Sequence, residues 1–143
     1  MDESGGFYTI KGYSLREDSQ ITNAMEDYLE MIARLSRDHG RVRVNELAQM
    51  LHVKASSASK MIQQLAQQGY LHAEKYGELL LTEDGRQLGE YLLYRHDVLQ
   101  RFLCFVNGSR DELKQVERIE HFLDKRTIYN LELLLQKIKP DSN

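Results

Sequence analysis

Apolar residues recur at intervals of three or four along most of the chain, the spacing that places them on one face of an α-helix. The first such stripe begins near Thr22 and ends near Gly40, and glycine is typical of a helix C-terminus. A short second helix is predicted over Val44–Leu51, and a third from Ser56 or Ser57 to about residue 68. The pattern therefore predicts a mainly α fold.

Residues 71–81 contain two short strand-like runs separated by Gly77, a pattern that predicts a β-hairpin. A long helix is predicted to open at Thr82 and to run through Leu99, and a final helical region follows residues 107–109. A helix, a short helix, a turn, a polar-faced helix and a hairpin in that order are typical of a winged helix-turn-helix. We therefore expect this domain over residues 21–90 and a helical domain over residues 91–143. Residues 1–20 contain three glycines and are expected to form an N-terminal arm.

Composition narrows the class of protein. The chain has 143 residues, enough for one domain or two small ones, and 41% of them are apolar. A net charge of −3 argues against nucleic-acid binding through gross charge, but residues 40–75 carry five Lys or Arg against two Asp or Glu. No apolar run approaches the ~20 residues of a membrane span, and the acidic start does not resemble a signal peptide. The single cysteine, Cys104, cannot form an internal disulfide, which suits a reducing cytoplasm, and its place in an apolar run predicts a buried thiol.

The local basic surplus coincides with the predicted DNA reader. Its third helix can offer serine and glutamine side chains to base edges, while lysine and arginine side chains contact phosphates. The candidate DNA-binding residues are Arg41, Arg43, Lys54, Ser56, Ser57, Ser59, Lys60, Gln63, Gln64 and Lys75. A solvated helix face has the same composition, and winged helices also mediate protein–protein contacts. The order of elements and the local charge favour double-stranded DNA as the partner.

Six possible metal ligands lie in three separate pieces of the chain. They are Asp27 and Glu30, then His96, then Glu117, Glu120 and His121. Spacings of three and four residues predict that each group shares one helix face. Each group alone is also typical of a solvated helix face. Together they offer four carboxylates and two imidazoles without sulfur, a set that suits manganese(II), and two divalent ions would balance the four negative charges.

Five stretches of the chain, in order, resemble one known family. They are Met25–Glu30, Ser56–Met61, Glu74–Tyr76, Leu93–His96 and Glu117–Leu123. The segment from Met25 to about Leu135 resembles the manganese-responsive, MntR-like branch of the diphtheria-toxin-repressor (DtxR) family. The resemblance implies that residues 91–143 form a metal-binding and dimerisation domain. It also implies a homodimeric, manganese-activated repressor of metal-uptake genes that binds operator DNA and is not an enzyme.

The resemblance further assigns the ligands to two Mn(II) ions per subunit. Asp27, Glu117, Glu120 and His121 would hold one ion, and Glu30 and His96 would hold the second together with the shared Glu117 and Glu120. Fe(II), Cd(II), Co(II) or Zn(II) are possible substitutes. Iron-responsive relatives carry Met and Cys in place of Asp27 and Glu117, so the resemblance favours manganese.

Three alternatives remain open, and one motif departs from the family. The alternatives are an iron-responsive regulator, a metal-independent winged-helix regulator and a di-metal hydrolase, although no separate nucleophile or base accompanies the ligands. The family usually places an arginine beside the wing glycine, whereas this chain has Tyr76-Gly77-Glu78. The acidic tip weakens the expectation of a contact between the wing and DNA phosphates.

Overall fold

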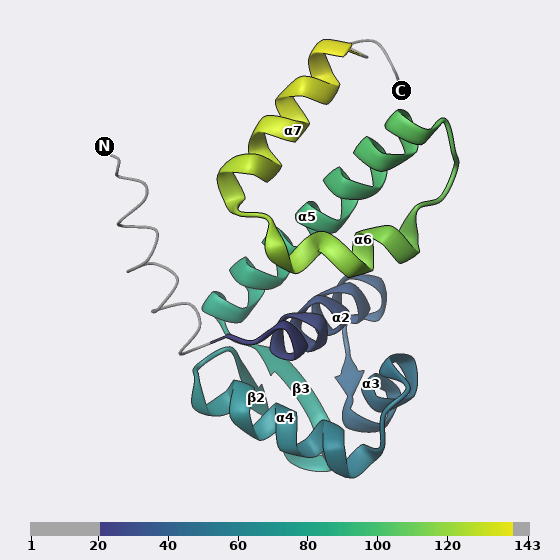
Figure 1. Cartoon of the computed structure of the whole chain (residues 1–143). Helices are drawn as coiled ribbons and strands as arrows, with labels where there is room; N and C mark the ends of the chain where they lie inside the picture. Colours follow the sequence, from purple (N-terminus) through teal and green to yellow (C-terminus); the bar gives the residue numbers. More distant parts are fainter. Residues whose placement is uncertain (1–20, 139–143) are drawn as a thin grey trace. The chain divides into compact units, whose positions relative to one another are not determined.

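A computed structural model of the chain describes residues 21–138, so the predicted arm over residues 1–20 lies outside the described residues. The mainly α fold is confirmed (Figure 1). In chain order the elements are α2 (Asn23–His39), β1 (Val42–Arg43), α3 (Val44–Leu51), α4 (Ala55–Gln67), β2 (Leu71–Ala73), the 3-10 turn η1 (Lys75–Gly77), β3 (Glu78–Leu81), α5 (Glu83–Asn107), α6 (Leu113–Ile119), the 3-10 turn η2 (Glu120–Phe122) and α7 (Lys125–Ile138). The chain divides into two compact units between Gly89 and Glu90, inside α5. Among the helices of the described part, none is long and apolar enough to cross a membrane.

Both ends of α2 lie where the sequence predicts them. The Thr22 hydroxyl accepts a hydrogen bond from the Met25 backbone N–H at 3.1 Å and so satisfies one of the free donors of the first turn. At the other end Gly40 adopts φ 83°, and its N–H donates to the Ser36 carbonyl at 2.8 Å. This left-handed backbone conformation is open to glycine at little cost, which explains why the helix ends there.

The helix-turn-helix is formed by α3 and α4. The bounds of α3 are those predicted, and His52 ends it with φ 58°, which reverses the chain towards α4. The start of α4 was predicted at Ser56 or Ser57, but the helix begins at Ala55, with Lys54 at the N-cap position and no side-chain cap. Because no serine hydroxyl caps this helix, the capping preference of serine misplaced its first residue.

A small antiparallel sheet completes the first unit, with the strand order β1–β3–β2. The predicted hairpin is present, with Leu71 opposite Leu81 and Ala73 opposite Leu79. The strand β1 was not predicted, because two residues are too short to show an alternating pattern. It forms by pairing with β3, where Val42 lies opposite Leu79. Both of these residues are buried, so β1 adds to the core of this unit.

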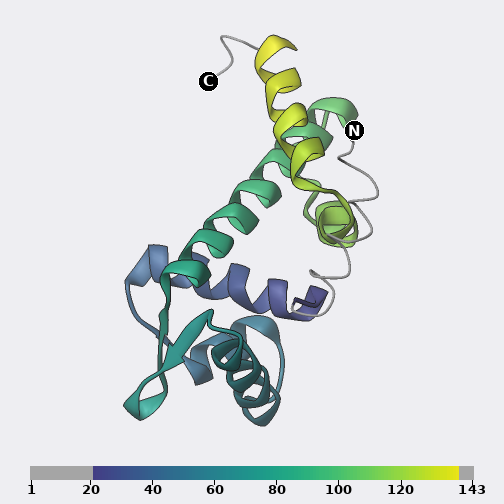
Figure 2. The same ribbon diagram turned by 90° about the vertical axis from the view of Figure 1, so that its left-hand side faces the viewer.

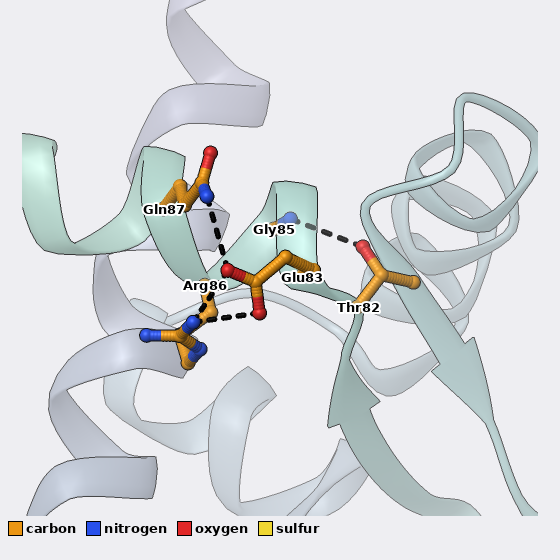
Figure 3. Close-up of polar contacts among 5 residues, drawn as sticks. All are labelled: Thr82, Glu83, Gly85, Arg86 and Gln87. Atoms are coloured by element: carbon orange, nitrogen blue, oxygen red, sulfur yellow. Dashed lines mark hydrogen bonds and ion pairs between the residues drawn. The ribbon is translucent and has the colours of Figure 1, made fainter.

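The Thr82 hydroxyl caps α5 and joins its start to the turn before β2; Figure 3 shows the capping bond from the Gly85 N–H. The Thr82 hydroxyl accepts from the Gly85 N–H at 3.0 Å and donates to the Gly69 carbonyl at 2.6 Å. A Cβ atom on Gly85 would lie 1.8 Å from the Tyr70 carbonyl oxygen. The two backbone segments approach so closely here that only glycine fits. Arg86 donates to Glu83 in the same turn and lowers the pKa of that carboxyl.

The second unit packs the C-terminal part of α5 against α6 and α7. Its core consists of Val98 and Leu99 from α5, Val116 from α6 and Ile128 from α7. Arg101 of α5 donates a hydrogen bond to Glu132 of α7, which lowers the pKa of the Glu132 carboxyl. Apolar residues of the last helical region therefore form much of this core, although Leu134 and Ile138 on α7 are exposed.

Two expectations for the second unit were wrong. The residues Glu117, Glu120 and His121 were expected on one continuous helix, but α6 ends at Ile119 and a 3-10 turn follows. The Asp124 carboxylate caps α7 by accepting from the Thr127 N–H at 2.9 Å, so the chain must leave the helical conformation before Asp124.

Cys104 was the second wrong expectation in this unit. Its thiol was expected to be buried, but Cys104 is half-buried, and its neighbours Phe105 and Val106 are exposed. Leu103 of the same apolar run packs against the core, whereas Phe105 and Val106 do not.

The Thr82 hydroxyl offers a direct test of how α5 begins. Substitution Thr82→Ala removes both of its hydrogen bonds and should lower the free energy of unfolding by about 1–2 kcal/mol, the usual cost of losing a helix cap. The matched variant Thr82→Ser keeps the hydroxyl and should lose less than about 0.5 kcal/mol. Urea unfolding of the three proteins measures the differences. Equal losses in the two variants would contradict the role of the hydroxyl.

Candidate DNA interface and metal-binding residues

The outward face of α4 consists of the polar residues expected to read DNA. Its members Ser56, Ser57, Ser59, Lys60, Gln63 and Gln64 are all exposed. The opposite face buries Ala58, Ile62 and Leu65, which fixes the rotation of the helix about its axis. The side chains that can bond to bases are therefore held on a packed element, with Lys60 among them as a cation for phosphate.

The remaining basic candidates are exposed near the hairpin and the turns. Lys54 precedes α4, and Lys75 lies in the 3-10 turn between β2 and β3. Arg43 donates from Nη1 to the Tyr76 carbonyl oxygen at 3.0 Å, and Arg41 Nε lies 3.8 Å from a Glu78 carboxylate oxygen. Both arginines therefore engage the tip of the hairpin, and their contact with phosphates stays a prediction.

Two of the six predicted metal ligands lie on α2 in the first unit. Asp27 is exposed, and Glu30, one turn further along, is buried. A Glu30 carboxylate oxygen accepts a hydrogen bond from Arg34 Nη2 at 2.9 Å. The prediction missed Arg34, although a cation four residues after a glutamate is a recognisable signal of an ion pair. A metal at Glu30 would have to compete with this guanidinium.

In the second unit the structure brings Glu120 and His96 together. His96 Nδ1 lies 3.4 Å from Glu120 Oε1, within ion-pair distance. Glu120 is only 3% exposed, and its Oε1 accepts no well-aligned hydrogen bond from any residue of the described range. Buried carboxylate oxygens normally have hydrogen-bond partners or a nearby cation. An oxygen and an imidazole in this arrangement fit a divalent cation.

The other two predicted ligands of the second unit differ in their surroundings. His121 is half-buried, and its Nδ1 lies 3.4 Å from Arg95 Nη2, on a side chain that is itself buried. Glu117 is exposed on α6. Arg95 was not among the predicted site residues, although it directly precedes His96. Its guanidinium supplies positive charge beside the imidazole of His121.

Comparison with known proteins supports both the DNA-binding and the metal-binding assignments. The family model "Iron dependent repressor, N-terminal DNA binding domain" matches residues 20–79, and the model "Iron dependent repressor, metal binding and dimerisation domain" matches residues 82–142. The HTH-type transcriptional regulator MntR of Geobacillus kaustophilus is 40% identical over 121 residues, which cover 84% of this chain and 86% of that protein.

Solved structures give the same picture. The metal-dependent transcriptional regulator MtsR aligns with a TM-score of 0.71 and 28% identity over 78% of this chain. The apo form of the manganese-activated repressor ScaR aligns with a TM-score of 0.63 and 26% identity over 76% of this chain. In both cases the match covers 53% of the other chain, so this protein spans about half the length of those structures.

The fold and these matches define a metal-dependent, winged-helix transcriptional regulator, and not an enzyme. The chain belongs to the iron-dependent repressor (DtxR) family, and within it to the MntR-like branch. A DNA-binding domain, a divalent-metal-binding domain and homodimerisation follow from that membership. The resemblance inferred from the sequence motifs is thereby confirmed.

Lys60 provides the test of the DNA interface. Substitution Lys60→Ala should weaken binding to every DNA sequence and should reduce the slope of log affinity against log salt by about 1.8, because a dimer loses two phosphate contacts of about 0.9 each. The exposed Lys114 of α6 is the matched control, since Lys114→Ala removes the same charge outside the predicted interface. Fluorescence anisotropy across a salt series measures both slopes. An unchanged slope in Lys60→Ala would show that Lys60 does not contact phosphate.

Proposed function

We propose that this protein is a homodimeric, cytoplasmic repressor of metal-uptake genes. Manganese(II) binding would activate it to bind the operators of those genes. The buried, weakly bonded carboxylate of Glu120 beside His96 is the observation that carries the manganese part of this proposal. The identity of about 40% to curated MntR proteins supports the regulatory role, and the manganese-activated repressor ScaR has the same fold.

The donor set of the proposed ligands fits manganese better than softer metals. It contains the carboxylates of Asp27, Glu30, Glu117 and Glu120 and the imidazoles of His96 and His121. Carboxylates are hard donors that manganese(II) accepts readily, whereas thiolate or thioether ligands shift preference towards softer ions. Iron-responsive relatives have such sulfur ligands in place of Asp27 and Glu117. We therefore favour a manganese regulator over the iron-responsive alternative.

The proposed ligands divide between two ions. Asp27, Glu117, Glu120 and His121 would hold one ion, and Glu30, His96, Glu117 and Glu120 the second. The exposed Glu117 is free of the burial that constrains Glu120, so its side chain can adopt a ligand conformation at a small cost. The guanidinium of Arg34 lies beside Glu30, and that of Arg95 lies beside His121. A bound metal ion would replace these guanidinium groups as the positive charge next to the two ligands. Fe(II), Cd(II), Co(II) and Zn(II) are possible substitutes for manganese at this set, and zinc would use only part of it.

A metal shared by ligands from both units gives a mechanism for activation. The ligands on α2 belong to the DNA-binding unit, and those on α5, α6 and η2 belong to the dimerisation unit. A metal bound to both sets would restrict the position of α4 relative to the dimer. Paired recognition helices must meet half-sites about one helical turn, ~34 Å, apart. Metal binding would thus favour the spacing that DNA requires, and DNA binding would in turn increase the affinity for metal.

Metal titration with a DNA-binding assay tests this function. Saturating manganese(II) should raise the affinity for a duplex selected by the wild-type protein from random-sequence DNA by at least about tenfold, within the usual 1–3 kcal/mol of coupling. Zinc(II) should activate less at full occupancy, because it prefers four tetrahedral ligands and would use only part of the set. Equal activation by both ions would contradict the manganese preference. Binding that no metal changes would favour a metal-independent regulator.

Asp27 distinguishes a metal ligand from a solvated carboxylate on α2. Substitution Asp27→Ala should reduce the manganese-dependent gain in DNA affinity by at least about tenfold, since loss even of an outer metal contact costs 10–100-fold. Its effect on metal-free stability should stay within about 0.5 kcal/mol, as for other exposed positions. Asp38→Ala is the matched control, because Asp38 is an exposed acid near the other end of the same helix. Manganese binding by calorimetry and DNA affinity are measured for the wild type and both variants. Full activation of Asp27→Ala by manganese would show that Asp27 is not a metal ligand.

A further inference from the structure

The tip of the β2–β3 hairpin holds a large side chain in an unusual backbone conformation. Tyr76 has φ 62° and ψ 26°, in the left-handed region that is uncommon for residues other than glycine. Tyr76 is 88% exposed, the highest value among the exposed large hydrophobic residues of the described chain. Within the first unit the hairpin extends beyond the neighbouring helices (Figure 2). The fold therefore accepts backbone strain and places an aromatic ring in solvent.

The strand β1 holds this conformation in place. Arg43 of β1 lies opposite Glu78 in the sheet, and its guanidinium Nη1 donates to the Tyr76 carbonyl oxygen at 3.0 Å. Gly77 follows with φ 76°, and a Cβ there would lie 3.8 Å from Val44 at the start of α3. Because β1 runs directly into α3, the tip of the hairpin is tied to the helix-turn-helix rather than left to move independently. Strained residues held by their surroundings concentrate at functional sites.

Lys75, in the same turn, is an exposed cation and a candidate phosphate contact, whereas the other charges near the tip do not supply a strong one. Glu78 is an acid beside the turn, and Arg41 Nε lies 3.8 Å from its carboxylate, so the two charges largely offset each other. Arg43 uses one of its donors on the Tyr76 carbonyl. Beside Lys75 the turn exposes the phenol of Tyr76, which is uncharged near neutral pH and has a flat apolar face and a hydroxyl.

We propose that Tyr76 contacts the sugar–phosphate backbone of duplex DNA beside the bases that α4 reads, with its ring against deoxyribose and its hydroxyl bonded to a phosphate oxygen. Tyrosine is among the residues that bond to phosphate in this way. Arg43 is a positioning residue that acts through the Tyr76 carbonyl and does not itself contact phosphate. The inference rests on DNA binding by the first unit and does not depend on the metal.

The test uses the full-length protein and a labelled duplex that the wild type selects from random-sequence DNA. Tyr76→Gly removes the side chain and relieves the left-handed strain, so its free energy of unfolding should not fall while its dissociation constant rises about fivefold to tenfold. Its salt slope should equal that of the wild type, because no charge is lost. Tyr76→Phe keeps the ring but removes the hydroxyl, so its dissociation constant for DNA should rise about twofold to threefold. Wild-type affinity in Tyr76→Gly would overturn the proposal.

A double-mutant comparison tests the role of Arg43. Arg43→Ala should weaken binding on its own, leave the salt slope unchanged and add little to Tyr76→Gly, because both changes act on one contact. A direct phosphate contact would instead give additive losses and a slope reduced by about 1.8 per dimer, and that result would overturn the positioning role. Arg110→Ala, at an exposed position before α6, controls for the lost charge.

The same series separates this inference from the proposed function. All variants are measured with saturating manganese(II) and again without metal at low salt. If manganese does not change wild-type binding, the proposed function fails, and the Tyr76 comparison is still decided by the metal-free dissociation constants. If manganese activates the wild type and Tyr76→Gly equally and to the same affinity, only the inference about the hairpin fails.

Discussion

A carboxylate that has been removed from water needs a cation or hydrogen-bond donors, and Glu120 meets this constraint incompletely within the described chain. It is 3% exposed, its Oε1 accepts no well-aligned hydrogen bond from the described residues, and His96 Nδ1 lies 3.4 Å away. Removing an ionised group from water without compensation costs several kcal/mol. A divalent cation could bind the carboxylate and the imidazole at once. The proposed metal dependence of this regulator follows from that requirement.

Much of the fold could be predicted because local chemistry determines it. The limits of α2 follow from the Thr22 cap and the left-handed Gly40, and both are visible as residue types at the ends of an apolar stripe. The hairpin follows from the same kind of signal at Gly77, whereas α3 has no side-chain cap and ends at His52 rather than at a glycine. The predicted DNA-reading face of α4 is exposed because Ala58, Ile62 and Leu65 on the opposite face are buried.

Features that depend on contacts between distant residues could not be predicted in this way. The strand β1 exists only through pairing with β3, more than thirty residues later, and the Arg43 bond to Tyr76 depends on that pairing. The end of α6 at Ile119 depends on the Asp124 cap of the next helix. For the metal ligands, the residue types were visible in the sequence. The pairing of Glu120 with His96, and of Arg95 with His121, required three-dimensional packing.

The central claim is that one metal centre connects the α2 helix of the DNA-binding unit to the dimerisation unit. Backbone amide hydrogen exchange with and without saturating manganese(II) tests it most directly, because exchange reports the opening of each segment separately. The account predicts slower exchange both in α2 around Asp27 and Glu30 and in the segment Leu113–Phe122, with no change in the hairpin strands β2 and β3. Slower exchange confined to the dimerisation unit, with α2 unchanged, would contradict the connection.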